Sequence, residues 1–426
     1  MRFIYNVTNT TKFLNQISEE LGYQITGPTE SVGWVNEAEF RGTLELVWTC
    51  VFTLFACLWA SLHLNIPGPD DTECTKYLRK LKWTFLAATF PEVVVSVAFV
   101  NWWDTRRDVA MMKEHGFNWD KKLCAFVRMG GVWLRGKPGS ESATDASLAN
   151  QEKTKGTPLI CTETDILRTL IQSRILDEDC LTRRVIDEKS KSDWVVKLIA
   201  CWQALYFGIQ CIGRWGSGLP LTALELSTVV FTTYALALYL LWWHKPVDVA
   251  MPVVFDVSQQ ALDHVWRHHD LSAPRSPWWT ESFAWNNLKD TTSIEIRRIP
   301  NSFSSTGGLR RDICLYPMLL SSFLFSGLHF LAWNFDFPTK VEQDLWRLSC
   351  IIMAAEPPLS TLLYILGSRR QWFRLDFLLN GVWLISMILY VAARFYLIVE
   401  VFVCLRVMPA GCYQTVDWIG SIPHIG

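Results

Sequence analysis

Two glutamates stand near the middle of long apolar runs, and each lies beside proline. Glu92 follows Pro91 in TFLAATFPEVVVSVAFV, and Glu356 precedes Pro357-Pro358. A carboxylate at the centre of a bilayer costs about 3 kcal/mol or more unless it is paired, hydrated or protonated. Desolvation favours the protonated form of a carboxyl group. We therefore expect these two side chains to be candidate proton donors.

Further polar groups lie in the other apolar runs. Glu225 is near the outer end of the fourth run, and Asp376 is near the inner end of the last run, which also holds Arg394 and Glu400. Interhelical hydrogen bonds or ion pairs that fix helix packing are the favoured interpretation of these groups. The candidate catalytic set, including possible proton acceptors, is Glu92, Glu356, Glu225 and Asp376.

Aromatic side chains are the second signal, because the chain contains 22 Trp. The face of an aromatic ring stabilises a cation by roughly 0.5–2 kcal/mol. An apolar aromatic chamber that contains one protonated acid is what the formation and guidance of a carbocation requires. For any single ring, packing between helices is the alternative explanation. The candidate substrate-binding residues inside the apolar runs are Trp48, Trp59, Trp202, Trp333, Trp383 and His329.

The apolar runs predict an all-α fold, a polytopic transmembrane helix bundle. Of the 426 residues, 50% are hydrophobic and 19% are charged, and the apolar residues cluster in blocks of about 20, the length that crosses a bilayer. About seven spans are predicted, the last of them long enough to tilt. Their ranges are 44–64, 82–103, 194–213, 221–243, 314–334, 345–366 and 375–405.

The segments between the spans divide the chain further. Loop 104–193 contains a Gly- and Ser-rich stretch, 136–158, that is typical of a disordered linker. Before this linker, 117–134 fits an amphipathic helix on the membrane surface, and after it 162–191 has helical spacing of apolar residues. The remaining segments are the polar residues 1–43, the aromatic loop 244–313 and the tail 406–426.

Lys and Arg residues indicate the orientation. They are concentrated in 104–193, 244–313 and 367–374, which places these loops in the cytoplasm, with a cytoplasmic N-terminus and a C-terminus on the other side. The Lys and Arg residues within 76–82 oppose this assignment. The alternative is a lumenal N-terminus, glycosylated at Asn6 or Asn9, with 82–103 as a re-entrant element.

A short motif occurs twice, as WWDTRRDV at 102–109 and WWHKPVDV at 242–249. Both copies follow apolar runs, so the repeat places the ends of the second and fourth spans on the same side. Tryptophan is favoured at the headgroup level of a bilayer. We expect both tryptophan pairs to lie at the cytoplasmic headgroup level.

Several classes of site are not indicated. The net charge of −1 gives no general attraction to nucleic acid. The 12 Cys form no CxxC pair, and no nucleotide-binding, zinc-protease or serine-hydrolase motif is present. The acidic residues at 70–73 follow Pro-Gly-Pro and indicate a turn rather than a magnesium site. We expect no metal and no redox cofactor.

Several stretches together carry a resemblance. They are RGTLELVWTCVFTLFACLWASLHLNIPGPDD, LRKLKW, FPE, LPLTALELSTVVFTTYALALYLLWWHKPVDV and RFYLIVEVFVCLRVMPAGCYQTVDWIGSIPHIG. They resemble a large family of fungal multi-pass membrane proteins, some of which look like the membrane-bound terpene cyclases of meroterpenoid pathways such as the ascofuranone route. The resemblance implies secondary metabolism and cyclisation of a prenyl chain that bears an epoxide. It assigns no residue roles.

The predicted function is a membrane terpene or meroterpenoid cyclase of the isomerase or lyase type. Glu92 or Glu356 would protonate a lipophilic prenylated small molecule. Membrane lipids and other pathway enzymes are the remaining expected partners, and the endoplasmic reticulum is favoured over the plasma membrane. A transporter, a channel, a receptor or a scaffold that recruits pathway enzymes are the alternatives.

Overall fold

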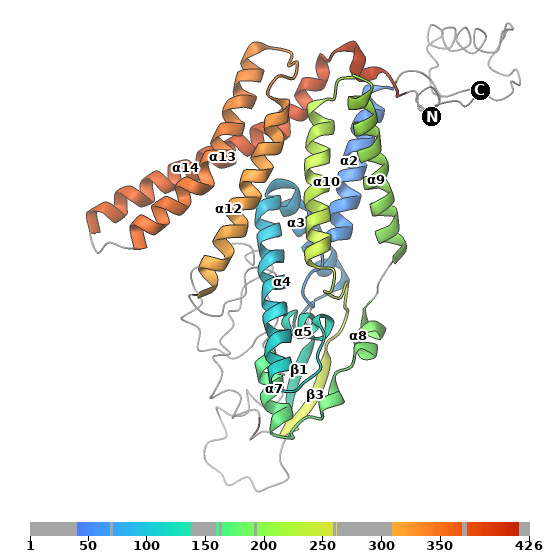
Figure 1. Ribbon diagram of the computed structural model, residues 1–426, viewed down its shortest axis with the longest axis vertical. Helices are drawn as coiled ribbons and strands as arrows, with labels where there is room; N and C mark the ends of the chain where they lie inside the picture. Colours follow the sequence, from blue (N-terminus) through green and yellow to red (C-terminus); the bar gives the residue numbers. More distant parts are fainter. Residues whose placement is uncertain are drawn as a thin grey trace, which may run out of the picture.

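The computed structural model describes residues 41–68, 71–137, 159–161, 164–190, 194–258, 261, 309–368 and 373–416. Long helices form a bundle at one end of the molecule, and short helices with a small sheet form a compact unit at the other (Figure 1). Helix α4 belongs to both parts, because its first half lies in the bundle and its last turns reach the sheet.

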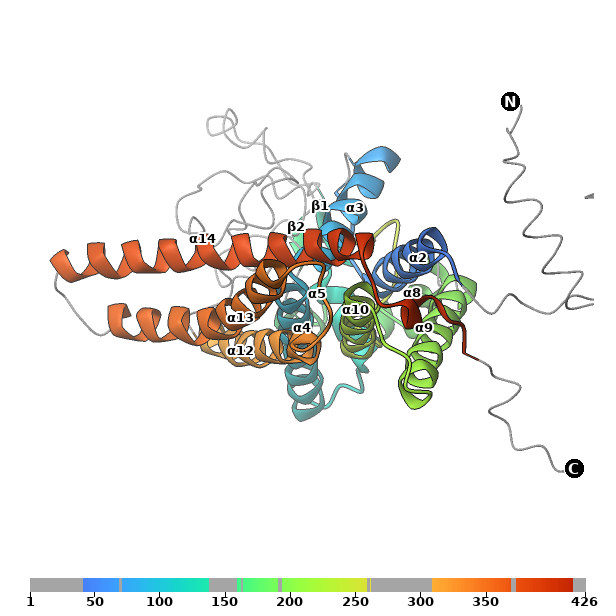
Figure 2. The same cartoon turned by 90° about the horizontal axis from the view of Figure 1, so that it is seen from above.

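The bundle contains two groups of helices. In the first group, α2 (Thr43–Ser61) packs against α9 (Trp194–Gly216) and α10 (Ala223–Leu241). In the second group, α13 and α14 run side by side and extend together away from α2 and α9 (Figure 2). The helices of the second group are α12 (Leu309–His329), α13 (Lys340–Ser368) and α14 (Phe373–Val403).

Three of the described helices are long and apolar enough to cross a membrane: α2, α10 and Leu379–Arg406, which includes most of α14. These helices are compatible with membrane association. The expectation of about seven spans is not supported. It counted each apolar stretch as one straight crossing, whereas the apolar part of α12 is only Tyr316–Ala332 and another predicted span is broken.

The broken span is the predicted segment 82–103. Helix α3 (Glu73–Thr89) ends where α4 (Pro91–Glu114) begins, and the two are bent by 112°. Phe90 has φ −135° and ψ 66°, because the residue before a proline is pushed out of the helical region. Pro91 then occupies the first position of α4, where its missing N–H costs nothing.

Both arms of this bend lead to the same end of the bundle. Lys80 of α3 lies 3.0 Å from Asp248, seven residues after the end of α10. Trp102 of α4 lines a pocket together with Trp242, the residue that caps α10. The geometry therefore favours the re-entrant alternative for 82–103, and it brings the basic residues of 76–82 to the side of loops 104–193 and 244–313. Asn6 and Asn9 lie outside the described residues.

A three-stranded sheet corrects the all-α expectation. Strand β1 (Val132–Lys137) is antiparallel to β2 (Leu159–Cys161) and parallel to β3 (Val253–Ser258), so loops far apart in sequence form one sheet. Residues 136–137 of the predicted linker complete β1, and the rest of that linker, 138–158, lies outside the described residues.

Short helices pack on this sheet. Segment 117–134 is not a surface helix, because α5 (Lys121–Arg128) buries Phe126 and Val127 completely before the chain turns into β1. The helical prediction for 162–191 is confirmed by α7 (Thr164–Gln172) and α8 (Arg183–Lys189), with the short turn Glu178–Cys180 between them. The unit has its own apolar core.

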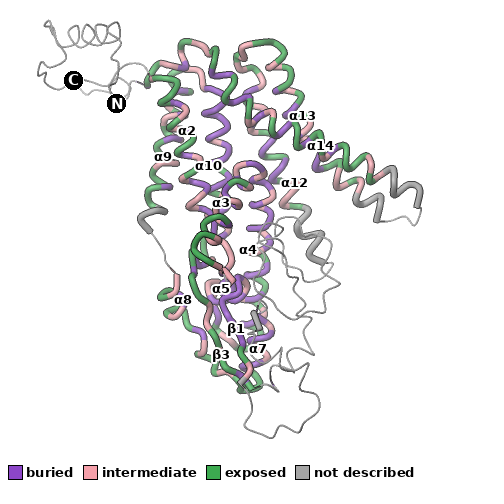
Figure 3. The backbone as a smooth tube through the Cα atoms, turned by 180° about the vertical axis from the view of Figure 1, so that it is seen from behind, coloured by how far each residue is buried: buried purple, intermediate pink, exposed green. Residues whose placement is uncertain are grey.

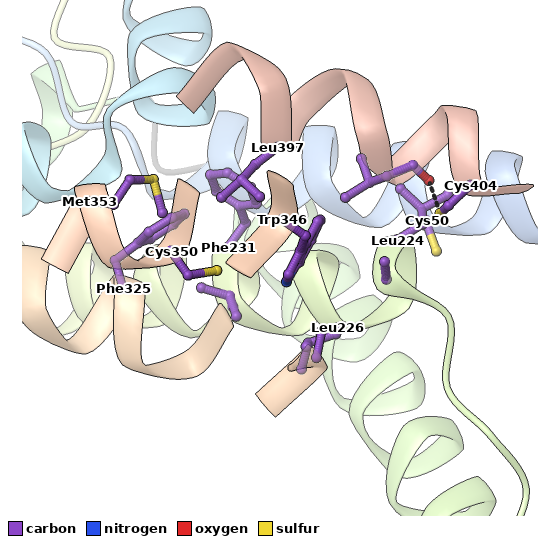
Figure 4. Close-up of a cluster of buried hydrophobic side chains, with 14 of the residues drawn as sticks. Cys50, Leu224, Leu226, Phe231, Phe325, Trp346, Cys350, Met353, Leu397 and Cys404 are labelled. Carbon is purple, nitrogen blue, oxygen red and sulfur yellow. Dashed lines mark hydrogen bonds between the residues drawn. The ribbon is translucent and has the colours of Figure 1, made fainter. Parts of the chain in front are cut away.

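The bundle has a separate core where α10, α12, α13 and α14 meet. Figure 4 shows Phe231, Phe325, Trp346, Met353 and Leu397 gathered at this point. The outer faces of α2, α9 and α14 are largely exposed, whereas α4 and α10 are buried over much of their length (Figure 3). An apolar exposed face on these helices is what contact with lipid requires.

The two ends of the described chain meet. The Arg41 amide donates to the Tyr413 carbonyl oxygen at 2.8 Å, and the Arg41 side chain lies 2.6 Å from Glu225. Residues 41 and 413 therefore lie at the same end of the bundle. The predicted topology, with the two termini on opposite sides of the membrane, is wrong for these residues, because Arg41 and Tyr413 are in contact.

Candidate functional site

Glu92 lies at the centre of a buried polar network. It stands in the first turn of α4 and is 1% exposed. Arg394 Nη2 donates to Glu92 Oε2 at 2.9 Å, and the Tyr390 hydroxyl donates to Glu92 Oε1. Tyr390 and Arg394 are one helical turn apart on α14, so they present their side chains on the same face.

Arg394 bridges the break between α3 and α4. Its Nε donates to the carbonyl oxygen of Thr89, the last residue of α3, at 2.5 Å, while its Nη2 holds Glu92. A cation is favourable at the C-terminus of a helix and an anion at the N-terminus. The guanidinium and the carboxylate thus stabilise the two helix ends that the bend leaves without intrahelical partners.

The same guanidinium contacts apolar groups of two other helices. Its central carbon lies 3.7 Å from the ring centroid of Phe325 on α12, and its Nη1 lies 3.6 Å from Met353 Sδ on α13. The Ser321 hydroxyl donates to the Glu92 carbonyl oxygen at 3.3 Å. The interior at this point holds a positive charge against an aromatic face.

These contacts limit the chemistry of Glu92. Its carboxylate oxygens accept from a guanidinium and from a phenol, so a proton on the carboxylate would displace one of the two donors. The geometry is that of an ionised carboxylate that accepts hydrogen bonds. The expectation that Glu92 is a neutral proton donor is therefore not favoured, and a role as anion or proton acceptor fits better.

Glu356 is the second buried acid of the region. It is 6% exposed on α13 and accepts from the Ser360 hydroxyl, and no basic side chain within the described residues forms an ion pair with it. Pro357 and Pro358 have no N–H, so two carbonyl groups of the preceding turn lack their helical donors. Glu356 lies one turn from Met353 and close enough to Tyr390 to interact with it electrostatically. The structure thus brings Glu92 and Glu356 into one region.

Glu225 lies elsewhere, in the first turn of α10. It caps this helix together with Thr222, whose hydroxyl accepts from the Glu225 amide at 3.1 Å. Its carboxylate pairs with Arg41 at 2.6 Å and lies 3.8 Å from Arg214. These contacts are those that the packing interpretation of Glu225 requires. Asp376 falls in α14, and its side chain lies outside the described residues.

Three of the predicted substrate-binding tryptophans do not line a chamber inside the described bundle. Trp48 is 69% exposed, Trp202 70% and Trp383 42%, so these rings face outward. Trp59 stacks on Phe55, 5.5 Å between centroids, close to Lys80. Sequence reasoning could not determine which face of each helix packs against the rest of the bundle.

The two remaining predicted substrate-binding residues are His329 and Trp333. The ring of His329 lies 4.4 Å from that of Phe325, and its Nδ1 lies 2.9 Å from the Phe325 carbonyl oxygen, within the core. Trp333 follows α12, where the Arg347 guanidinium lies 5.1 Å from its ring. His329 is thus the substrate-binding candidate that is closest to the buried network.

Sequence reasoning missed Met353, Ser321 and the pairing of Glu92 with Arg394. The available signal was the four-residue spacing of Tyr390 and Arg394, which places a phenol and a guanidinium on one face of an apolar helix. It could not reveal the partner, because 302 residues separate Arg394 from Glu92.

Comparison with known proteins gives a family. The sequence profile of DUF8562 matches residues 20–273 and 305–425. The chain belongs to this family. DUF8562 is a family of unknown function, and its match includes every helix of the network described above. Neither a search of characterised proteins nor a search of solved structures gave a match.

Proposed function

We propose that the protein is an integral membrane enzyme that cyclises the prenyl chain of a lipophilic substrate by protonation. The observation that carries this proposal is Glu356, a buried carboxyl group without a basic partner among the described residues, close to Tyr390. The reaction class comes from the resemblance to meroterpenoid cyclases, and the endoplasmic reticulum is the proposed membrane.

The proposed reaction begins with Glu356. Its carboxyl group gives a proton to the epoxide oxygen, a C–O bond breaks, and the electrons of a chain alkene form a ring bond to the resulting cationic carbon. A proton lost from the last cation restores neutrality, so substrate and product have the same mass. Glu92 is the proposed final acceptor, with the Tyr390 hydroxyl as relay.

Stabilisation of the cation is the second requirement. Phe90 stacks on Tyr390 with 6.3 Å between ring centroids, and Arg394 already rests on the face of Phe325. Aromatic faces of this kind attract positive charge. The aromatic groups assigned to substrate are therefore Phe90 and Tyr390 rather than the outward-facing tryptophans.

The test compares Glu356→Gln with wild type in a host supplied with prenylated epoxides, with products separated by chromatography and identified by mass and NMR. General acid catalysis contributes roughly 10²–10⁴-fold, so the variant should lose product by at least about 100-fold at equal protein level. Glu400→Gln is the matched control, because Glu400 is also buried, 3% exposed, on α14. Full activity of Glu356→Gln, or no conversion by wild type, would overturn the proposal.

Transport is the second candidate, favoured by the break between α3 and α4. Broken helices whose N-termini lie inside the bundle form the substrate sites of many secondary transporters. Glu92 and Arg394 would then be the groups that exchange partners during transport. Flux into proteoliposomes without chemical change of the solute would distinguish this candidate from a cyclase.

A further inference from the structure

The two copies of the WW-x4-DV motif meet at one pocket. Trp102 from the first copy and Trp242 from the second both line it. Their neighbours point the other way, since Trp103 is 46% exposed and Trp243 is 60% exposed. Each pair therefore has one ring in the pocket and one ring available to the membrane interface, where tryptophan is favoured.

Positive charge is in excess around this pocket. Arg128 is bound by Asp108, with contacts of 2.6 and 2.8 Å, and by Asp104 at 3.2 Å. Lys121, His244 and Lys245 also line the pocket. Within the described residues, no carboxylate forms an ion pair with Lys121 or Lys245.

Lys245 is the most distinctive of these groups. Its Nζ donates to Asn65 Oδ1 at 2.8 Å and lies 5.0 Å from the centroid of Trp242. Burial, assisted by Arg79, lowers the pKa of Lys245 to about 7. An ammonium group in this position lacks a counter-charge, and an anion in the pocket would supply it.

The volume of the pocket limits the size of the ligand that can enter it. The pocket, which is partly open to the surface, has a volume of about 30 Å³, which is room for about one water-sized polar group. An oxygen of a larger anion fits there, with the remainder at the mouth. Lys121 of α5 and Lys245 approach this space from the sheet unit and from the bundle, respectively.

We propose that this pocket binds a phosphate group through Lys245 and Lys121, either as the headgroup of an anionic lipid or as part of a small phosphorylated molecule. The pocket lies at the boundary between the bundle and the sheet unit, at the level of the outward-facing Trp103 and Trp243. Phosphate offers several oxygen acceptors, so one of them reaches Lys245 while another contacts Lys121. This proposal is independent of the cyclase proposal.

The experiment uses the full chain in neutral detergent and measures binding of two probes, inorganic phosphate and short-chain phosphatidic acid, with phosphatidylcholine as the lipid reference. The variants are Lys245→Gln and Lys121→Gln. Lys113→Gln is the matched control, because Lys113 is an exposed lysine on the last turn of α4, outside the pocket. Loss of one charge-assisted hydrogen bond corresponds to roughly a 10-fold weaker affinity or more.

We expect wild type and Lys113→Gln to bind at least one probe, and each pocket variant to bind it about 10-fold more weakly. Binding of phosphatidic acid alone identifies a lipid headgroup, and binding of both probes identifies phosphate itself. Wild type that binds neither probe, or a Lys121→Gln variant with unchanged affinity, overturns the proposal. Lys121 is only partly buried, so its variant remains informative if Lys245→Gln does not fold.

Discussion

The buried pair of Glu92 and Arg394 determines how the bundle is built at the residue scale. Both side chains are 1% exposed, and their partners come from α3, α4, α12, α13 and α14. Removing both charges from water is costly, and their attraction offsets that cost only while each has its hydrogen bonds. The pair therefore specifies one arrangement of these helices.

Glu92→Gln and Arg394→Met should each lower the free energy of unfolding by about 3–5 kcal/mol, because each leaves a buried charge without its partner. Titration with denaturing detergent, followed by circular dichroism, measures this. The double variant should lose less than the sum of the single variants.

The matched control for these single and double variants is Arg184→Gln. Arg184 pairs with Glu188 on the surface of α8, with side chains 89% and 65% exposed, and exposed pairs contribute roughly 0–1 kcal/mol. Additive losses from the Glu92 and Arg394 variants would show that the two side chains act independently.

Lys245 should make stability depend on pH. Its pKa is about 7 in the folded chain and 10.5 for an ordinary lysine, so between these values the unfolded chain binds one more proton. Stability should consequently rise with pH from about 7 to 10. Below about pH 7 both states are protonated and this contribution to the slope ends.

The measurement is thermal unfolding of wild type and Lys245→Met at several pH values. The difference between the two proteins removes the contribution of every other titrating group. An unchanged difference between pH 7 and pH 10 would contradict the lowered pKa of Lys245.

The bend between α3 and α4 is the feature that matters most at the element scale. Pro91 makes a break predictable from the sequence, because proline starts helices more easily than it continues them. The angle was not predictable, since it depends on Arg394, whose contact with Thr89 spans 305 residues of the chain. Apolar composition alone describes a straight span and a bent pair equally well.

Membrane-impermeant thiol reagents should label both ends of this pair from the same side. Cys74 is exposed in the first turn of α3, and a His115→Cys variant would place a thiol just after α4. In a single straight span, these positions would be labelled from opposite sides. A thiol at Ser217, in the turn between α9 and α10, is the control for the other side.

The whole molecule combines a bundle of long, partly apolar helices with a sheet unit that the sequence did not reveal. The long apolar helices were predictable because their composition is sufficient evidence. The sheet was not, because β1 pairs with β2 across the predicted linker and with β3 from a different loop. The burial of Glu92 and Glu356 was predictable from their place in apolar runs. The side to which each tryptophan points was not, because it depends on packing among distant helices.

The C-terminal segment should contribute strongly to the stability of the whole molecule. Arg214 is 1% exposed and donates to the carbonyl oxygens of Gly411, Cys412 and Gln414 as well as Pro220. A chain that ends at residue 409 should show a markedly lower melting temperature, because most acceptors of a buried guanidinium are lost. A chain that ends at residue 416 keeps these acceptors and should melt like wild type.

The same contact imposes an order on biosynthesis. Arg214 leaves the ribosome roughly 200 residues before three of the four carbonyl groups that accept from it, so the end of α9 and the start of α10 cannot reach their final state until the C-terminal segment has been made. The interval is about 10–40 s at ordinary elongation rates. Throughout that time a guanidinium destined for burial must remain in contact with water, lipid phosphate or a chaperone.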